Sequence, residues 1–437
     1  MSRFIYNIVL HSLVAPFLAV YYFPRIVLGK KYRQSLHGKL GRLPTGFVPE
    51  KLSKPRVWFH AVSVGEVTAL GPLVKAFKDL QPLASVIVST GTETGQARAH
   101  EVISHADAFF YLPLDFPAFV NNVVSRIRPD LFVLMETELW PNLIHSIKSN
   151  GAIIALANGR ISDRSFPRYK RLRGFFASTL KHIDLFLMAS EIDGRRMEEM
   201  GAPSGRIQVT GNTKFDAALR KIPIEAETEM SDVLEINGSV PVFVAGSTHP
   251  GEHEIVLDAY RTLTQEFPEL LLILVPRHVD KTPQILSAMR DRSMEPPFLR
   301  SSVETGEKRN GRKVIIVDRT GELFQIFSLA SVVFIGGSLV PKGGQNILEP
   351  AAWGKMVLFG PSTEDFREAR DILVSAGSGV EVTGTEDLVR KVAGVLSDPA
   401  RAEILGKRGR EEILKHIGSS RRNAEILAKY VSTSQVS

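Results

Sequence analysis

The chain has 437 residues, 44% of them hydrophobic, and carries a net charge of +7 with no cysteine. That length exceeds one ordinary domain and predicts two or three domains with packed cores. The lack of cysteine excludes disulfides, thiolate metal sites and a cysteine nucleophile. The positive charge favours an anionic partner, and nucleic acid, acidic lipid and a phosphorylated substrate all fit it.

The first element in the chain is an uncharged stretch from Phe4 to Phe23. About 20 apolar residues suffice to span a bilayer, and an in-plane interfacial helix or a buried core helix are the alternatives. Basic residues are more numerous after this stretch than before it, which places the following domain in the cytoplasm. We assign residues 1–43 as a membrane anchor with a basic juxtamembrane segment that lies on acidic headgroups or a phosphorylated lipid.

Residues 44–215 alternate between apolar strand patterns and helical patterns and form the first predicted domain. The alternation predicts an α/β fold with a parallel sheet covered by helices on both faces. Strands are predicted at residues 57–62, 85–89, 107–112, 131–135, 152–157, 185–189 and 208–210.

Three carboxylates follow strands of this sheet, at the edge where open α/β sheets bind ligands. Glu66 follows the first strand, where a carboxylate suits a general base; the alternative is a residue that only complements the helix dipole. Glu136 and Glu138 follow the fourth strand. Adjacent carboxylates repel, so one of the two is expected to carry a raised pKa, unless the turn is simply solvated.

Residues 216–239 lose the hydrophobic rhythm and gather acidic residues, which indicates an interdomain linker. A second alternation of strands and helices fills residues 240–437, with mostly helix after Thr385. Its strands are predicted at residues 242–245, 270–275, 314–317, 332–335 and 356–359. Two similar α/β halves predict a ligand cleft between them.

A glycine-rich stretch, FIGGSLVPKGGQNILEPAAWG at residues 334–354, follows a strand of the second half. Glycine lets main-chain N–H groups approach a ligand. Pro350 predicts a helix start, which puts Glu349 at the helix mouth, where its carboxylate can accept ribose hydroxyls. The alternative is that Asn346 and Glu349 only cap their own helix.

Three further turns of the second half lie on the predicted ligand edge. Residues 246–250 form a second candidate phosphate turn, Arg277 is placed to hold a phosphate, and Thr320–Glu322 open a helix. A surface arginine and an ordinary N-cap are the alternatives for the last two. The chain contains no Asp-x-Asp, Walker loop or dinucleotide GxGxxG, so metal-bridged diphosphate-sugar chemistry lacks support.

Several stretches together resemble one family, the Kdo transferases of lipopolysaccharide synthesis, where Kdo is 3-deoxy-D-manno-octulosonic acid. They run across almost the whole chain: FHAVSVGE (59–66), YLPLDFP (111–117), METELWPN (135–142), VTGNTKFD (209–216), AGSTHPGE (245–252), LVPRH (274–278) and GGSLVPKGGQNILEPAAWGK (336–355). The resemblance implies a GT-B fold, in which two Rossmann-like domains face each other across a cleft, with a membrane-associating N-terminal helix.

The resemblance also implies an inverting transfer of Kdo from CMP-Kdo to the phosphorylated lipid A precursor, lipid IVA, at the cytoplasmic face of the inner membrane. Glu66 matches the family's general base, and Glu136 and Lys214 match its transition-state stabilisers. The matches to its CMP-binding segments are Pro276, Arg277, Thr320, Gly321, Glu322, Asn346, Ile347, Leu348 and Glu349. No metal, cofactor or nucleic-acid partner is implied.

Two other interpretations stay open at the level of sequence. The same architecture serves nucleotide-sugar epimerases and other glycosyltransferases. A membrane-anchored binding module without catalysis belongs to another class, and the paired carboxylates argue against it.

Overall fold

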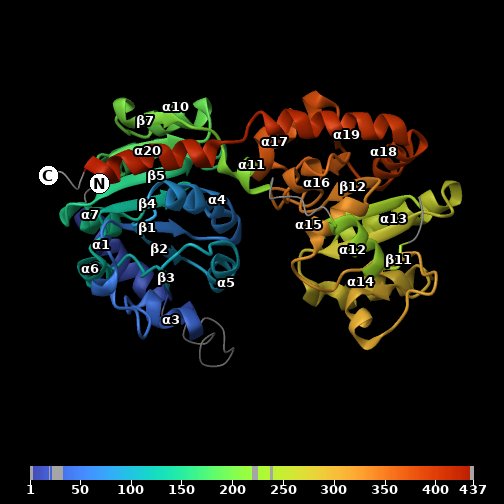
Figure 1. Ribbon diagram of the computed structural model, residues 1–437, viewed down its shortest axis with the longest axis horizontal. Helices are drawn as coiled ribbons and strands as arrows, with labels where there is room; N and C mark the ends of the chain where they lie inside the picture. Colours follow the sequence, from blue (N-terminus) through green and yellow to red (C-terminus); the bar gives the residue numbers. More distant parts are fainter. Residues whose placement is uncertain (1–2, 19, 22–32, 219–224, 237–239, 434–437) are drawn as a thin grey trace. The chain divides into compact units, whose positions relative to one another are not determined.

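The computed structural model describes residues 3–18, 20–21, 33–218, 225–236 and 240–433. The chain forms two compact units, described here one at a time: a first unit of Met1–Ala217 with Ile417–Ser437, and a second unit of Ala218–His416. Each unit is built on a seven-stranded sheet in which every strand pair is parallel (Figure 1). The predicted α/β class is confirmed.

The sheet of the first unit has the order β3-β2-β1-β4-β5-β6-β7. Its strands are β1 (Arg56–Ala61), β2 (Ser85–Thr90), β3 (Ala108–Tyr111), β4 (Leu131–Met135), β5 (Ile153–Gly159), β6 (Leu185–Met188) and β7 (Ile207–Val209). The central strands are buried along their whole length, which explains their continuous apolar sequences.

Helices cover both faces of this sheet. One face packs against α4 (Val64–Leu80), α5 (Glu93–Val102) and α20 (Ser419–Thr433). The other packs against α6 (Pro117–Ile127), α7 (Pro141–Ser149), α9 (Arg173–Leu180) and α10 (Glu191–Glu199). The remaining short elements are α3 (Arg33–Lys39), η2 (Pro49–Lys51), α8 (Phe166–Arg171), η3 (Ser204–Arg206) and α11 (Thr213–Ala218).

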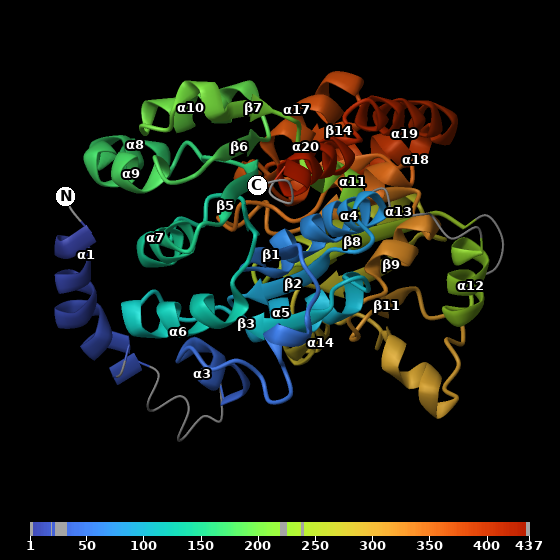
Figure 2. The same cartoon turned by 60° about the vertical axis from the view of Figure 1, so that its left-hand side comes forward.

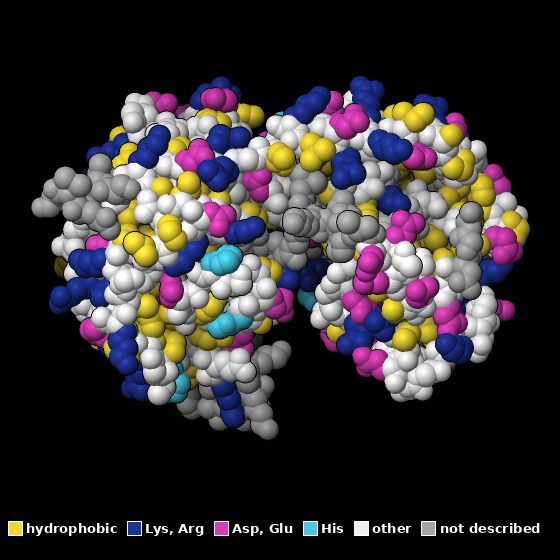
Figure 3. Space-filling view, in the orientation of Figure 1, with side chains coloured by type: hydrophobic (Ala, Val, Ile, Leu, Met, Phe, Trp, Pro, Cys, Tyr) yellow, Lys and Arg dark blue, Asp and Glu magenta, His cyan; other side chains and the backbone are white. Residues whose placement is uncertain are grey.

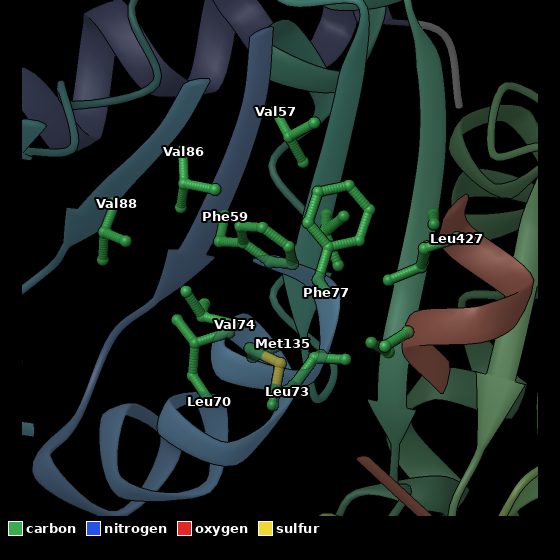
Figure 4. Packing of buried hydrophobic residues seen from close by; sticks show 14 of the residues in the cluster. Val57, Phe59, Leu70, Leu73, Val74, Phe77, Val86, Val88, Met135 and Leu427 are labelled. Carbon is green, nitrogen blue, oxygen red and sulfur yellow. The ribbon is translucent and has the colours of Figure 1, made fainter. Parts of the chain in front are cut away.

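Helix α20 completes the core of the first unit. Figure 4 shows Leu427 of α20 pointing into the same cluster as Phe59 of β1 and Phe77 of α4. The two phenylalanine rings meet edge to face with centroids 5.7 Å apart. The Asp216 carboxylate accepts the N–H groups of Gly418 and Ser420, at 2.6 Å each, and so fixes the start of α20 beside α11.

The sheet of the second unit has the order β10-β11-β9-β8-β12-β13-β14. Its strands are β8 (Val242–Thr248), β9 (Leu271–Pro276), β10 (Phe298–Leu299), β11 (Val314–Ile316), β12 (Val332–Ile335), β13 (Val357–Phe359) and β14 (Gly379–Glu381). Helices α13 (Glu252–Glu266), α14 (Thr282–Asp291) and α18 (Thr385–Ser397) pack on one face. The other helices are α12 (Ala226–Val233), α15 (Leu323–Ile326), α16 (Leu348–Ala352), α17 (Arg367–Ala376) and α19 (Pro399–Leu414), with short η4 (Val279–Lys281), η5 (Arg300–Thr305), η6 (Phe327–Leu329) and η7 (Glu364–Phe366).

Two predicted boundaries need correction. Residues 417–437 were assigned to the second domain, yet they belong to the first unit, because the apolar face of α20 packs on α4 and β5. The predicted linker, residues 216–239, also holds the end of α11 and all of α12. Ala226 and Met230 of α12 are buried, and the helix contacts α15, so it is part of the second unit.

The amino-terminal stretch is helical and packs on the first unit. Helix α1 (Arg3–Val9) continues as the π-helix η1 (Leu10–Val14), and Figure 2 shows α1 beside α6 and α7. The Tyr6 hydroxyl donates to Asp115 Oδ2 at 2.9 Å, and Asn142 Nδ2 donates to Asn7 Oδ1 at 2.6 Å. Within the described part of the chain, no helix has both the length and the apolar character needed to cross a membrane. Residues 1–2, 19 and 22–32 of the predicted anchor and basic juxtamembrane segment lie outside the described residues.

Basic side chains are spread over the surface rather than gathered in one place on the visible face. Figure 3 shows Lys and Arg side chains on both units, interspersed with acidic and hydrophobic ones. The net charge of +7 therefore does not appear on this face as one continuous basic surface of the kind that binds nucleic acid.

Candidate active site

The sheet of the first unit has its topological switch point between β1 and β4. The chain runs outward from β1 through β2 and β3, and then returns to β4 on the other side of β1. Loops that leave these two strands at their carboxyl ends diverge and leave room for a ligand. Glu66 follows β1, and Glu136 and Glu138 follow β4, so the predicted carboxylates flank this point.

Glu66 lies in the first turn of α4 and is 8% exposed. Its Oε2 accepts the Val62 N–H at 2.8 Å, and its Oε1 accepts the Ser63 hydroxyl at 2.9 Å. Ser63 is the N-cap of α4 and also accepts the Glu66 N–H. These capping contacts at the start of α4 hold the carboxyl group in a fixed orientation.

The surroundings of the Glu66 carboxyl raise its pKa towards neutral pH. Burial raises the pKa of this carboxyl to about 7, and the negative charge of Glu136 acts in the same direction, while the Val62 N–H opposes both. A general base works best when its pKa lies near the operating pH. A pKa of about 7 suits the Glu66 carboxyl to act as a general base at neutral pH.

Glu136 is held in the left-handed region, with φ of 54°, directly after β4. Its main-chain N–H donates to the Ala157 carbonyl at 2.9 Å, and its Oε1 lies 3.1 Å from Lys214 Nζ. Burial opposes ionisation of Glu136, but the cations Lys214 and Arg160 outweigh it and lower the pKa of this carboxyl. A non-glycine residue with positive φ at a strand end is a common mark of a functional site.

One carboxyl of the Glu136–Glu138 pair has a raised pKa, as predicted, and the pKa of the other is lowered. Burial and the charge of Glu136 raise the pKa of Glu138, whereas the pKa of Glu136 is lowered. The first unit therefore gathers three carboxyls and the cation Lys214 at one strand edge. This arrangement can take up a proton at Glu66 and present a fixed positive charge nearby.

Asn158, which was not predicted from the sequence, holds the segment that carries Lys214 through a hydrogen bond to the neighbouring Thr213. It is fully buried at the end of β5, with φ of 54°, and its Oδ1 accepts the Thr213 N–H at 3.0 Å. The Lys214 N–H in turn donates to Asn212 Oδ1 at 3.0 Å. A buried asparagine within an apolar strand was the available signal, because a buried amide needs partners.

The second unit repeats the topology, with its switch point between β8 and β12. Pro276 ends β9, and Arg277 follows it with an exposed side chain while its N–H donates to the Thr248 carbonyl at 2.9 Å. Thr320–Glu322 precede α15, and Gly321 adopts a φ of 98°. Since β8, β9, β11 and β12 are parallel neighbours, the loops after them share one edge.

Glu322 of this edge pairs with an arginine that sequence analysis did not single out. Arg300 Nη2 lies 2.8 Å from Glu322 Oε1, and Arg300 is 8% exposed. Arg300 Nε and Glu322 Oε2 are buried and make no hydrogen bond within the described residues. The ion pair fixes the orientation of the Glu322 carboxylate beside Gly321.

The glycine-rich loop differs from the prediction, because most of its N–H groups already have partners inside the protein. Those of residues 337, 338 and 339 donate to the Glu252 carboxylate. Those of residues 336, 343, 344 and 345 donate to Gly246 O, Ser362 Oγ, Gly337 O and Gly336 O. The glycines serve this close internal packing, so these seven N–H groups are not donors to a bound phosphate in this arrangement.

The Asn346–Glu349 segment forms the start of α16, with Glu349 in its first turn as predicted. Asn346 Nδ2 donates to Glu349 Oε1 at 3.1 Å, and Asn346 Oδ1 accepts the Leu348 N–H at 3.1 Å. Ile347 and Leu348 are each 1% exposed. Their side chains belong to the core, so only their main chain is placed to meet a ligand.

The described residues contain no group of three or more His, Asp or Glu side chains arranged to hold a metal ion. His249 and His253, which share a four-residue spacing, instead make separate contacts. His253 Nε2 lies 3.2 Å from the Thr248 carbonyl, and the His249 ring lies edge to face with that of His278 at 5.8 Å.

Two Rossmann-like units in one chain, each with its ligand edge at a switch point, define the GT-B class of sugar-transferring folds. In keeping with that class, 86% of the chain superimposes on all of a UDP-GlcNAc 2-epimerase from Neisseria meningitidis, solved bound to UDP-GlcNAc, with a TM-score of 0.59. The two share 14% sequence identity, so this likeness concerns the fold alone.

Comparison with known sequences identifies the family. Residues 34–217 match the family model described as 3-deoxy-D-manno-octulosonic-acid transferase. The chain is 33% identical to the 3-deoxy-D-manno-octulosonic acid transferase of Haemophilus influenzae over 93% of both chains. It is 31% identical to that of Chlamydia pneumoniae over 98% of this chain and 96% of the relative. The chain belongs to the Kdo transferase family, as the motifs indicated.

Proposed function

We propose that the protein transfers Kdo from CMP-Kdo to the phosphorylated lipid A precursor, lipid IVA, with inversion at the anomeric carbon. The observation that carries the proposal is the Glu66 carboxyl, whose pKa burial raises to about 7 beside the Glu136–Lys214 pair, in a chain of the Kdo transferase family. In that state the carboxyl exchanges a proton readily at neutral pH.

In the proposed step, the carboxylate of Glu66 removes the proton from a hydroxyl of the acceptor sugar. The hydroxyl oxygen forms a bond to the anomeric carbon of Kdo, and the bond from that carbon to the phosphate oxygen breaks. The electron pair leaves with CMP, and the proton stays on Glu66 until solvent removes it. Lys214 opposes negative charge that builds up on the phosphate or on the Kdo carboxylate.

The experiment that tests this function uses the full chain with CMP-Kdo and lipid IVA in detergent micelles. Mass spectrometry of the lipid is expected to show added Kdo, and NMR of the product the inverted anomeric configuration. Glu66→Gln is expected to lower kcat by roughly a hundred- to ten-thousand-fold while CMP binding measured by calorimetry stays nearly unchanged. Glu101→Gln, on the exposed face of α5, is the matched control. Near-normal turnover of Glu66→Gln would refute the assignment of the base.

We further propose that the protein acts on the cytoplasmic face of the inner membrane and that α1 lies in the plane of the membrane surface. One side of this segment is fixed to the first unit by Tyr6 and Asn7. On the other side of α1, Phe4 and Ile8 are 73% and 50% exposed, and Phe17, which follows η1, is 64% exposed. Exposed apolar side chains of this size on a docked helix fit the boundary between headgroups and acyl chains.

Vesicle flotation tests the membrane contact. Full-length protein with Phe4→Glu and Phe17→Glu is expected to lose binding to vesicles that contain anionic lipid. Leu83→Glu, at an 82% exposed position before β2, is expected to keep it. Equal binding of both variants would contradict the proposed role of α1.

A further inference from the structure

The carboxylate of Glu252, outside the predicted site residues, accepts four main-chain hydrogen bonds. Glu252 begins α13 and is fully buried. Its Oε2 accepts the N–H groups of His249 and Gly337 at 2.9 and 2.7 Å. Its Oε1 accepts those of Ser338 and Leu339 at 3.0 and 2.9 Å. Four charge-assisted hydrogen bonds replace the water that burial removes.

The Glu252 carboxylate occupies a turn of main-chain N–H groups that would otherwise suit a bound anion. Successive N–H groups that converge in a turn form a concavity that binds phosphate or carboxylate. Here the turn at residues 337–339 receives Glu252 instead. A Cβ on Gly336 would come within 2.6 Å of the main chain at residues 247–248 and within 2.8 Å of Glu252 Oε2, so only glycine leaves room for both at that position.

The same carboxylate joins two loops that leave adjacent strands. His249 follows β8, residues 337–339 follow β12, and these two strands form the switch point of the second sheet. The backbone before His249 is strained, since Ser247 has a φ of 54° at a break in the β8–β9 register. Such strain persists only where neighbouring contacts enforce it, and Glu252 supplies one of them.

The loops after β9 and β12 present exposed polar side chains at the edge that they share with the loop after β8. The ring centroids of His249 and His278 lie 5.8 Å apart. Burial lowers the pKa of His249, and the nearby charge of Glu252 opposes this shift. Arg277, His278 and Lys342 are exposed, and they come from the loops after β9 and β12. His249 Nε2 is buried and makes no hydrogen bond within the described part of the chain.

We propose that Glu252 is a positioning residue of the donor site: it occupies the anion-binding turn at residues 337–339 and fixes His249, so that the anionic groups of the donor bind to side chains, namely Arg277, His278 and Lys342. The inference rests on the proposed function, because the donor is the sugar nucleotide named there. The bound anion is either the phosphate of the nucleotide or the carboxylate of the acid sugar.

The experiment compares Glu252→Gln with Glu254→Gln in the full chain. Glu254 lies two positions further in α13, and its Oε2 accepts only a local N–H, that of Gly251, at 2.9 Å. Glu252→Gln is expected to raise the KM for CMP-Kdo about tenfold or more with a smaller change in kcat and none in the KM for lipid IVA. Glu254→Gln is expected to stay within about twofold of wild type. Glu252→Asp, which keeps the charge, is expected to restore part of the affinity.

A second set of variants changes exposed side chains, so it does not depend on how the protein tolerates a substitution at the buried Glu252. Lys342→Met and His278→Gln change exposed side chains and are each expected to raise the KM for CMP-Kdo about tenfold. If the affinity for CMP falls in parallel, the anion is the phosphate; if CMP binds as before, it is the carboxylate of the sugar. Unchanged donor KM in both variants would overturn the proposal, as would a folded Glu252→Gln with wild-type donor KM. Failure of the wild-type chain to transfer Kdo would instead overturn the proposed function.

Discussion

Lys214 Nζ lies 3.1 Å from Glu136 Oε1 at the carboxyl edge of the first sheet. The two side chains come from α11 and from the turn after β4, and their charges set the titration of the neighbouring carboxyls. Because the pair is mostly buried, with 17% and 23% of the side chains exposed, each charge depends on the other more than a surface pair would.

The pH dependence of catalysis follows from Glu66. The base must be deprotonated, and its folded pKa is raised to about 7, so kcat/KM is expected to rise with pH up to about 7 and then to level off. Glu138→Gln removes one of the negative charges that raise this pKa and is expected to shift the acidic limb to lower pH. A pH–rate profile of both proteins checks this, and an unshifted limb would exclude the coupling.

Removal of the cation is expected to impair chemistry more than binding. Lys214→Met should lower kcat by roughly a hundredfold or more, since a fixed charge aimed at developing negative charge is lost. Lys214→Arg should retain part of the activity. Combining Lys214→Met with Glu136→Gln should cost less than the sum of the two single changes, because each single change leaves a buried charge unpaired. Steady-state kinetics measure this, with Lys75→Met on the exposed face of α4 as the control.

The Arg300–Glu322 pair is expected to act on donor affinity. Arg300→Met leaves the Glu322 carboxylate without its cation and should raise the KM for CMP-Kdo about tenfold with little change in kcat. Arg319→Met removes an exposed partner of Glu304 and should behave like wild type. If both variants have the same donor KM, the segment at residues 320–322 takes no part in donor binding.

His60 is expected to make the first unit sensitive to acid. It is fully buried in β1, and burial lowers the pKa of its imidazole to about 4, although hydrogen bonding to Ser89 opposes the shift. A folded pKa below the unfolded value means that stability is present near pH 7 and is lost as pH falls from about 6.5 towards 4.

At pH 5 this loss amounts to about 2 kcal/mol. Hydrogen exchange of the β1 amides at pH 7.5 and 5 should reveal it after correction for the intrinsic exchange rate. His60→Gln should reduce the difference between the two pH values. An equal pH effect in both proteins would assign the acid sensitivity to other groups.

Much of the sheet and part of the site could be predicted from sequence, because buried parallel strands leave continuous apolar stretches. Leu131–Met135 and Val332–Ile335 were predicted with the bounds that the structure has. The edge strands β10 and β14 have two and three residues and were missed, since neither shows the fully buried apolar pattern of the central strands. Glu66 and Glu136 followed from their places after strands.

What the sequence could not supply was contact between distant segments. The apolar face of α20 indicates that the helix is buried, but not that it packs on α4, more than 300 positions earlier. Lys214 was predicted only from the family resemblance, because its proximity to Glu136 arises from the tertiary fold. Glu252 looks like an ordinary residue of a first helical turn, and nothing local indicates that its carboxylate binds residues 337–339.

The return of α20 to the first unit bears on how the protein is made. Residues 218–416 form one uninterrupted unit, so this part can close as soon as it has left the ribosome. The core of the first unit stays incomplete, with the apolar surfaces of α4 and β5 that α20 covers exposed, until residues 417–437 have been synthesised. During that interval we expect this exposed face to be where the nascent chain is most open to misfolding.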